Sequence, residues 1–163
     1  MKAIVLFISN RNKAIKIIID PVIKSSSGFD FWQEETNKTD LFETLSNSFL
    51  ITPNYLEATQ LMPADDAKDA AQRLAQYCAV LLKGGHNAEE TGIDYLYTKN
   101  AVEKLLPHSK IITPKHGSGC VLSASITANI ALGFEIITAC EKAKRYIEQF
   151  LSSNNSLLGY HYV

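Results

Sequence analysis

The sequence predicts an α/β fold in which helices flank a largely parallel sheet. Two observations carry this prediction. Short apolar runs alternate along the chain with segments whose apolar residues recur at helical spacing. Polar residues, glycine or proline follow directly after the apolar runs, as is typical of strand ends. One β-hairpin is expected in addition to the parallel strands.

Four short apolar runs predict the parallel strands. Each has the length of a strand and is followed, directly or after one residue, by a proline or a charged residue. The first run is continuous except for Lys16, a pattern typical of a strand that is covered on both faces. These strands are expected at residues 15–19, 49–51, 79–82 and 111–113.

Helix starts and stops are marked by capping residues. Asp40, with Glu43 three residues later, predicts a capped helix start, and Asp65 or Asp66 predicts another. Gly133 is expected to end a helix. Residues 1–10 predict a short helix or an edge strand. The remaining helices are expected from residue 40 onward and at residues 55–61, 67–78, 120–132 and 136–151.

The hairpin is expected late in the sheet. Segments 94–98 and 101–105 flank Lys99-Asn100, a two-residue polar link of the kind that favours a β-hairpin. We expect this hairpin to be the only antiparallel element.

Length and composition exclude several classes of protein. The 163 residues predict one domain over residues 1–163. The formal net charge is -1 and the 16 basic residues are scattered, which argues against partners such as nucleic acid or a membrane. The 3 cysteines show no Cys-x-x-Cys spacing, and their odd number argues against a disulfide framework or a zinc site. These cysteines predict a reducing cytoplasmic location.

Polar signatures follow the ends of all four expected parallel strands. They are Asp-Pro-Val at residues 20–22, Thr-Pro-Asn-x-x-Glu at 52–57, Lys-Gly-Gly-His at 83–86 and His-Gly-Ser-Gly-Cys at 116–120. The carboxyl ends of parallel strands meet at one edge of the sheet, and ligands bind at that edge. The sequence therefore predicts a single binding site built from these four segments.

The last signature predicts an anion site. A strand, a glycine-rich turn and a helix start follow in this order, so the first amides of the helix would point at a ligand such as phosphate. Cys120 would lie at the positive end of the helix dipole, where the pKa of a thiol is expected to fall. The structural alternative is a plain turn with an inert, buried cysteine.

The four signatures together, in this order and at these separations, resemble the hydroxymethylpyrimidine/phosphomethylpyrimidine kinases of thiamine biosynthesis, members of the ribokinase-like superfamily. The resemblance extends from about residue 15 to the end. Most members of the superfamily carry aspartate where this chain has Cys120. The family usually has threonine where this chain has Ser118, a change that keeps the hydroxyl group.

The resemblance implies ATP-dependent phosphorylation of hydroxymethylpyrimidine and of its monophosphate, with ATP and Mg²⁺ as cofactors. It implies that Cys120 is the catalytic base that takes the proton of the substrate hydroxyl group. The other roles are an anion hole at Gly117, Ser118 and Gly119, ATP binding at Thr52, Asn54, Lys83 and Gly85, and metal binding at Asp20 and Glu57. As structural alternatives, Asp20 would be a turn residue, and Glu57 and Lys83 would be solvated.

The resemblance also implies that the chain corresponds to the carboxyl-terminal portion of such a kinase and holds little of the pyrimidine pocket. We therefore expect little kinase activity. We also expect either a homo-oligomer that forms through the amino-terminal region or a marginally soluble chain, because the edge of strand 15–19 is exposed and residues 3–8 are the nearest segment that could cover it. Two alternatives stay open. One is a pyridoxal kinase, because pyridoxal also carries a hydroxymethyl group on a flat heterocycle, and the other is a catalytically inactive nucleotide-binding module.

Overall fold

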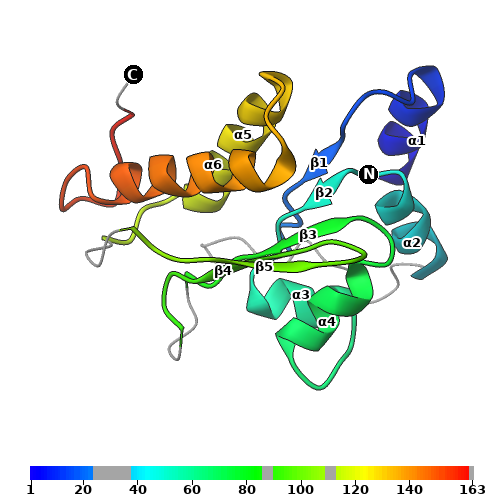
Figure 1. The fold of residues 1–163 in the computed structure, drawn as a ribbon, viewed down its shortest axis with the longest axis horizontal. Helices are drawn as coiled ribbons and strands as arrows, with labels where there is room; N and C mark the ends of the chain where they lie inside the picture. Colours follow the sequence, from blue (N-terminus) through cyan, green and yellow to red (C-terminus); the bar gives the residue numbers. More distant parts are fainter. Residues whose placement is uncertain (24–37, 86–89, 109–112, 162–163) are drawn as a thin grey trace. The chain divides into compact units, whose positions relative to one another are not determined.

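The computed structural model describes residues 1–23, 38–85, 90–108 and 113–161. The chain divides into two compact units, Met1–Lys104 and Leu105–Val163. Within these ranges the first unit holds the sheet and four helices, and the second holds two helices (Figure 1). That residues 1–163 act as one domain stays a prediction.

In the described part of the chain the sheet has five strands, in the order β1-β2-β3-β4-β5 (Figure 1). The pairs β1·β2 and β2·β3 are parallel, as predicted, whereas β4 pairs antiparallel with β3. The expectation that the hairpin is the only antiparallel element was therefore wrong. The strands are β1 (Ile18–Ile19), β2 (Leu50–Ile51), β3 (Ala79–Leu82), β4 (Asp94–Tyr97) and β5 (Val102–Leu105).

Strands β1, β2, β4 and β5 are each shorter than predicted at one end. The first strand is limited to Ile18–Ile19, which pair with Leu50 and Ile51, although the Ile17 carbonyl also accepts a hydrogen bond from the Phe49 amide at 2.7 Å. The link between β4 and β5 is longer than Lys99-Asn100, since Thr98 and Ala101 close it. The Thr98 amide donates to the Ala101 carbonyl at 2.8 Å, and the Ala101 amide donates to the Thr98 hydroxyl at 3.1 Å.

The helices of the first unit are α1 (Lys2–Arg11), α2 (Lys38–Ser46), α3 (Tyr55–Leu61) and α4 (Ala67–Leu74). Asp66 caps α4 by accepting a hydrogen bond from the Asp69 amide. Asp40 is not the cap of α2, because the helix already begins at Lys38. Its carboxylate instead accepts a hydrogen bond from Lys2 of α1 at 2.7 Å, which ties the two helices together.

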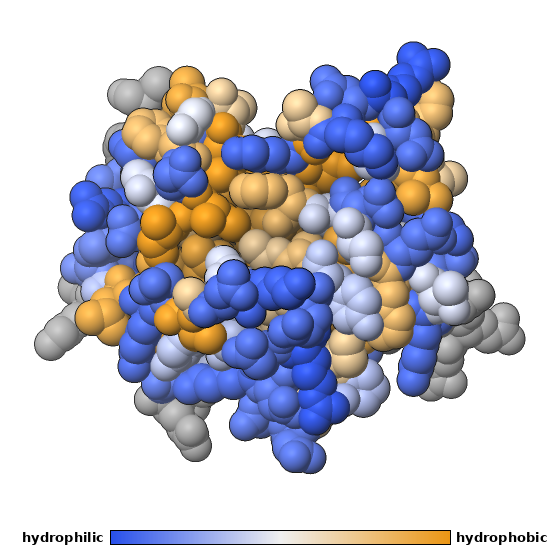
Figure 2. Space-filling model, turned by 45° about the vertical axis from the view of Figure 1, so that its right-hand side comes forward, coloured by the Kyte–Doolittle hydropathy of each residue, from blue (hydrophilic) through white to orange (hydrophobic). Residues whose placement is uncertain are grey.

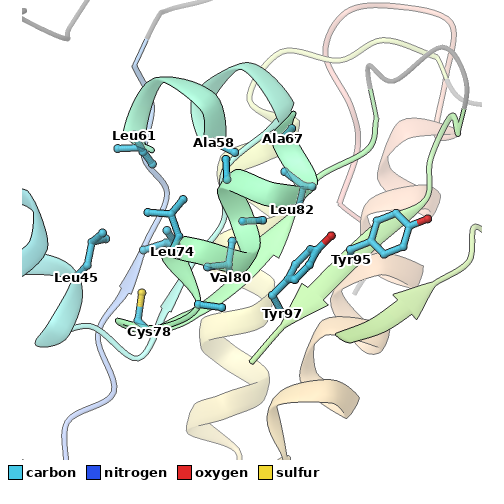
Figure 3. Close-up of a cluster of buried hydrophobic side chains, with 14 of the residues drawn as sticks. Leu45, Ala58, Leu61, Ala67, Leu74, Cys78, Val80, Leu82, Tyr95 and Tyr97 are labelled. Atoms are coloured by element: carbon cyan, nitrogen blue, oxygen red, sulfur yellow. The ribbon is translucent and has the colours of Figure 1, made fainter. Parts of the chain in front are cut away.

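The core of this unit lies between the sheet and helices α3 and α4 (Figure 3). Val80 and Leu82, two residues apart on β3, share one face of the strand and meet Leu61 and Leu74 from the helices. Burying a side chain of this size contributes about 1.5–3 kcal/mol. The apolar spacing that predicted helix and strand is therefore the packing surface that joins them.

The second unit is built on α5 (Ser118–Ala131) and α6 (Ile136–Leu151), which pack against each other. Gly133 follows α5 with a φ of 91°, a left-handed conformation that suits a glycine at a helix end. Helix α5 begins at Ser118, two residues earlier than predicted. Residues 111 and 112 of the expected last strand lie outside the described residues.

Hydrophobic residues, drawn in orange, are exposed among hydrophilic ones, drawn in blue (Figure 2). Helix α1 contributes Ile4 and Phe7, whose exposed fractions are 65% and 59%. Among the described residues, every helix is too short or too polar to cross a membrane.

A charged cluster joins α4 to β4, and it generates a pH prediction. The Glu90 carboxylate accepts hydrogen bonds from the Lys68 ammonium and the Tyr95 hydroxyl, both at 2.7 Å. These contacts, that of Lys68 first, lower the pKa of Glu90 to about 2. Because this pKa is depressed on folding, the stabilisation is complete above the ordinary carboxyl pKa and is lost as the pH falls toward about 2.

We therefore expect Glu90→Gln to lower the unfolding midpoint in urea at neutral pH and to flatten its decline between about pH 4.5 and pH 2. Glu103→Gln, at an exposed residue of β5, is the matched control and should follow the wild type. Parallel pH curves for wild type and Glu90→Gln would contradict this assignment.

Candidate functional site

The carboxyl ends of the three parallel strands bring charged side chains together. Asp20 follows β1 and Lys83 follows β3, on either side of the segment that follows β2. The Lys83 ammonium lies 3.0 Å from Asp20 Oδ1 and 3.8 Å from Glu57 Oε2. The structure therefore gathers both predicted metal ligands and one predicted ATP ligand into one cluster.

The backbone around Lys83 is held on both sides. The Lys83 amide donates to the Pro53 carbonyl at 2.8 Å, and Asn54 and Lys83 form a parallel bridge that prolongs the pairing of β2 with β3. Thr52, fully buried, donates its hydroxyl hydrogen bond to Asp20 Oδ1 at 3.2 Å. Thr52 and Asn54, predicted to bind ATP, thus lie beside the charged cluster.

Asn54 and Glu57 form a capping box at the start of α3. The backbone amide of Asn54 donates to Glu57 Oε2 at 2.7 Å, and the backbone amide of Glu57 donates to the side-chain oxygen Oδ1 of Asn54 at 2.8 Å. The Glu57 carboxylate is buried, so the alternative of a solvated helix face is wrong. The capping hydrogen bond therefore fixes the position of the Glu57 carboxylate beside Lys83.

Burial raises the pKa of Glu57, against the opposing effects of the Asn54 amide and the Lys83 ammonium. Two carboxylates thus face one ammonium in a site that is poorly solvated. Such a site favours an additional cation, and carboxylate oxygens suit Mg²⁺.

Among the described residues, no group of three or more His, Cys, Asp or Glu side chains could hold a metal by itself. Two carboxylates fit an ion that takes its remaining ligands from water and phosphate, as Mg²⁺ usually does.

Asp94 shapes the turn that follows Lys83. The Gly84 amide donates to the buried Asp94 carboxylate at 2.8 Å. A Cβ atom at Gly84 would lie 1.8 Å from the backbone oxygen of Ile93, so only glycine fits. From the sequence, Asp94 was expected only as the first residue of the hairpin. The sequence signal that could have revealed its role is the position of a carboxylate at the start of a strand that is otherwise apolar and aromatic. His86 lies outside the described residues.

The glycine turn of the second unit has the predicted geometry of a helix start. Gly117 is the N-cap of α5, with a φ of 74° that L side chains rarely adopt. Ser118, Gly119 and Cys120 form the first turn of the helix, in which the amides are directed toward its N-terminal end. This is the backbone arrangement that an anion hole requires.

The turn is anchored to the carboxyl-terminal segment. The buried Lys115 ammonium donates to the backbone carbonyls of Asn154 and Ser156, at 2.5 and 2.6 Å. The His116 amide donates to the Leu157 carbonyl at 2.9 Å. Lys115 was not singled out from the sequence, because its partners are backbone groups with no sequence signature.

The three cysteines divide as predicted. Cys78 and Cys140 are buried, and burial raises the pKa of the Cys78 thiol to about 12. Cys120 is exposed, so the alternative of an inert, buried cysteine is wrong at this position. It borders an open, mostly apolar cavity of about 510 Å³ between α5 and the segment after α6, with His161 hydrogen-bonded to Tyr146 at its wall.

The turn after β3 generates a prediction on stability. Gly84→Ala should lower the free energy of unfolding by about 1–3 kcal/mol, because the backbone must move to admit the methyl group. The neighbouring Gly85→Ala is the matched control. A Cβ atom there meets nothing within 4 Å among the described residues. Equal urea midpoints for the two variants would contradict the role given to Gly84.

The comparisons with known proteins agree in one family. The family model described as phosphomethylpyrimidine kinase matches residues 1–162. A hydroxymethylpyrimidine/phosphomethylpyrimidine kinase of Bacillus subtilis is 32% identical over 142 residues, which are 82% of this chain and 52% of the relative. The kinase of the same name from Aquifex aeolicus is 34% identical over 149 residues, 86% of this chain and 58% of the relative. The chain thus spans about half the length of these relatives.

Solved structures of two kinds of kinase share the fold of this chain. A phosphomethylpyrimidine kinase from Clostridium difficile matches with a TM-score of 0.68 and 29% identity, over 90% of this chain and 63% of that protein. An ADP complex of Bacillus subtilis pyridoxal kinase matches with a TM-score of 0.75 and 26% identity, over 94% of this chain and 62% of that protein.

Proposed function

The chain belongs to the phosphomethylpyrimidine kinase family, and we propose that it transfers the γ-phosphoryl group of ATP to hydroxymethylpyrimidine and to its monophosphate. The observation that carries this proposal is the exposed Cys120 thiol in the first turn of α5, behind the left-handed Gly117. Such a turn can hold phosphoryl oxygens on backbone amides while a side chain at the same place handles a proton.

In the first proposed transfer, the substrate hydroxyl oxygen attacks the γ-phosphorus, and the bond from this phosphorus to the bridging oxygen of ADP breaks. In the second transfer, an oxygen of the monophosphate attacks instead. The Cys120 thiolate takes the proton of the hydroxyl group, helped by the positive end of the helix dipole. The amides of Gly117, Ser118 and Gly119 stabilise the charge on the moving group.

The cluster of the first unit supports the nucleotide role. Lys83 would meet the nucleotide phosphates as a point charge, with Thr52, Asn54 and Gly85 beside it. Asp20 and Glu57 would hold Mg²⁺, directly or through water. When bound, this ion supplies positive charge that neutralises the phosphate oxygens during transfer.

The test is ADP release by the chain with ATP, Mg²⁺ and hydroxymethylpyrimidine. Cys120→Ala should lower the rate by about 10²–10⁴-fold without changing the affinity for ATP, because a general base acts on the proton and not on the nucleotide. The ratio of the two rates is informative even for a slow wild-type chain. Thr127→Ala, an exposed change in the same helix, is the control.

Undiminished turnover by Cys120→Ala would remove the thiol from the reaction. ATP binding with no turnover in the wild type would favour the alternative of a nucleotide-binding module.

Pyridoxal is the second candidate substrate, because a pyridoxal kinase matches the fold at 26% identity with a TM-score of 0.75. The same assay with pyridoxal in place of the pyrimidine distinguishes the two, since the preferred heterocycle gives the higher kcat/KM. We also infer a cytoplasmic location, supported by three cysteines without disulfide spacing.

We further infer that the chain forms a homo-oligomer through its amino-terminal region. Residues 3–8 belong to α1, which packs against α2. Strand β1 ends the sheet order, and α1 exposes Ile4 and Phe7. Both features support association with a second copy.

Phe7→Asp should therefore lower the molar mass measured by light scattering, because it places a charge in the apolar contact. Leu132→Asp, the same kind of change at another exposed residue, should leave the mass unchanged. A monomeric wild type would contradict the inference.

A further inference from the structure

The Lys83 ammonium lies between two carboxylates that are largely withdrawn from water. The exposed fractions of the side chains are 15% for Lys83, 13% for Asp20 and 9% for Glu57. An ion pair so placed is poorly screened, so its charges act on any further ion that approaches. Among the described residues, Lys83 is the cation that lies against both carboxylates.

In each carboxylate, a single oxygen accepts all the hydrogen bonds that are found among the described residues. Asp20 accepts from Thr52 and Lys83 through Oδ1, and Glu57 accepts from Asn54 and approaches Lys83 through Oε2. Within the described residues no hydrogen bond is found to the second oxygens, Oδ2 and Oε1, and these are the atoms that a divalent cation would bind. Such a cation would have to bind beside an ammonium of the same sign, which opposes its binding.

The ammonium can leave while the backbone stays. The Lys83 backbone is fixed through Pro53, and the next residue is fixed through the bond from the Gly84 amide to Asp94. The side chain carries its charge on a flexible four-carbon stem. A phosphate anion at the edge of the sheet can therefore draw the ammonium away from Asp20 and Glu57 without rearranging the strand ends.

We propose that Lys83 is the resident counter-ion of Asp20 and Glu57, and that it makes the binding of a divalent cation to this pair depend on nucleotide phosphate. The proposal rests on the proposed function, because it takes the phosphate to be that of a nucleotide. Without phosphate, Lys83 competes with the metal ion. With phosphate, Lys83 moves to the anion, and the carboxylates accept the metal. By thermodynamic linkage, the metal then strengthens phosphate binding by the same factor.

The experiment measures the affinity of the chain for Mn²⁺ alone, from the electron paramagnetic resonance signal of the free ion. Lys83→Gln should bind Mn²⁺ about tenfold more tightly than the wild type, a factor within the usual range of coupling between two sites. The same variant should bind ADP more weakly in the presence of a chelator, because it has lost the phosphate ligand.

Two variants serve as controls. Lys83→Arg keeps the charge and should bind Mn²⁺ as the wild type does. Lys99→Gln removes the same charge in the link between β4 and β5, away from the cluster, and should also leave Mn²⁺ affinity unchanged. Equal Mn²⁺ affinity in wild type and folded Lys83→Gln would overturn the proposal, as would equal tightening in Lys99→Gln.

A measurement on the wild type covers the case in which Lys83→Gln does not fold. Mn²⁺ that displaces the ammonium should raise the rate at which acetic anhydride labels Lys83 relative to Lys99, measured by mass spectrometry. An unchanged labelling ratio at saturating Mn²⁺ would overturn the proposal. If the labelling ratio is unchanged but the wild type binds ADP and turns over substrate, only the counter-ion role of Lys83 is overturned and the proposed function stands. If the wild type does not bind ADP, both the proposed function and the counter-ion role are overturned.

Discussion

The parallel pairing of β1, β2 and β3 is the constraint on which the candidate site depends. Asp20 and Lys83 are 63 positions apart in the sequence, yet their charged atoms lie 3.0 Å apart. Each follows its strand directly, so the register of the sheet decides the distance between them. The hydrophobic core under β3 holds that register, because a slip by one residue would turn Val80 and Leu82 away from α3 and α4.

Glu57 connects the stability of this fold with its chemistry. Its carboxylate satisfies the Asn54 amide at the start of α3, and the same oxygen faces the Lys83 ammonium. A carboxylate that serves only as a helix cap is more stable in its charged form when water surrounds it. Glu57 is buried, and burial raises its pKa. The fold thus keeps a partly desolvated carboxylate at this site, and a bound cation would stabilise its negative charge.

The glycine turn of the second unit depends on local geometry. Gly117 takes a left-handed conformation and starts α5, and the amide direction follows from the helix itself. Lys115 and His116, just before the turn, bond to carbonyls of the carboxyl-terminal segment. The Lys115 side chain and the His116 backbone amide therefore anchor the turn, backbone groups form it, and the Cys120 thiol is exposed.

The sequence by itself determined the elements whose signals are local. Helix α3 and strand β3 have the predicted bounds, because a capping box and a continuous apolar run act within a few residues. The family also followed from the sequence, since the four motifs are short and ordered. Helix α2 was predicted to start too late, because Asp40 bonds to Lys2, a partner that spacing within α2 does not show.

Only the tertiary structure decided how distant residues meet. In the structure β4 runs antiparallel to β3, the Gly84 amide donates to the Asp94 carboxylate, and Glu57 is buried beside Lys83. The physical reason is the same in each case. Strand direction, burial and ion pairing are set by contacts between segments far apart in the chain, whereas propensity and capping act between near neighbours.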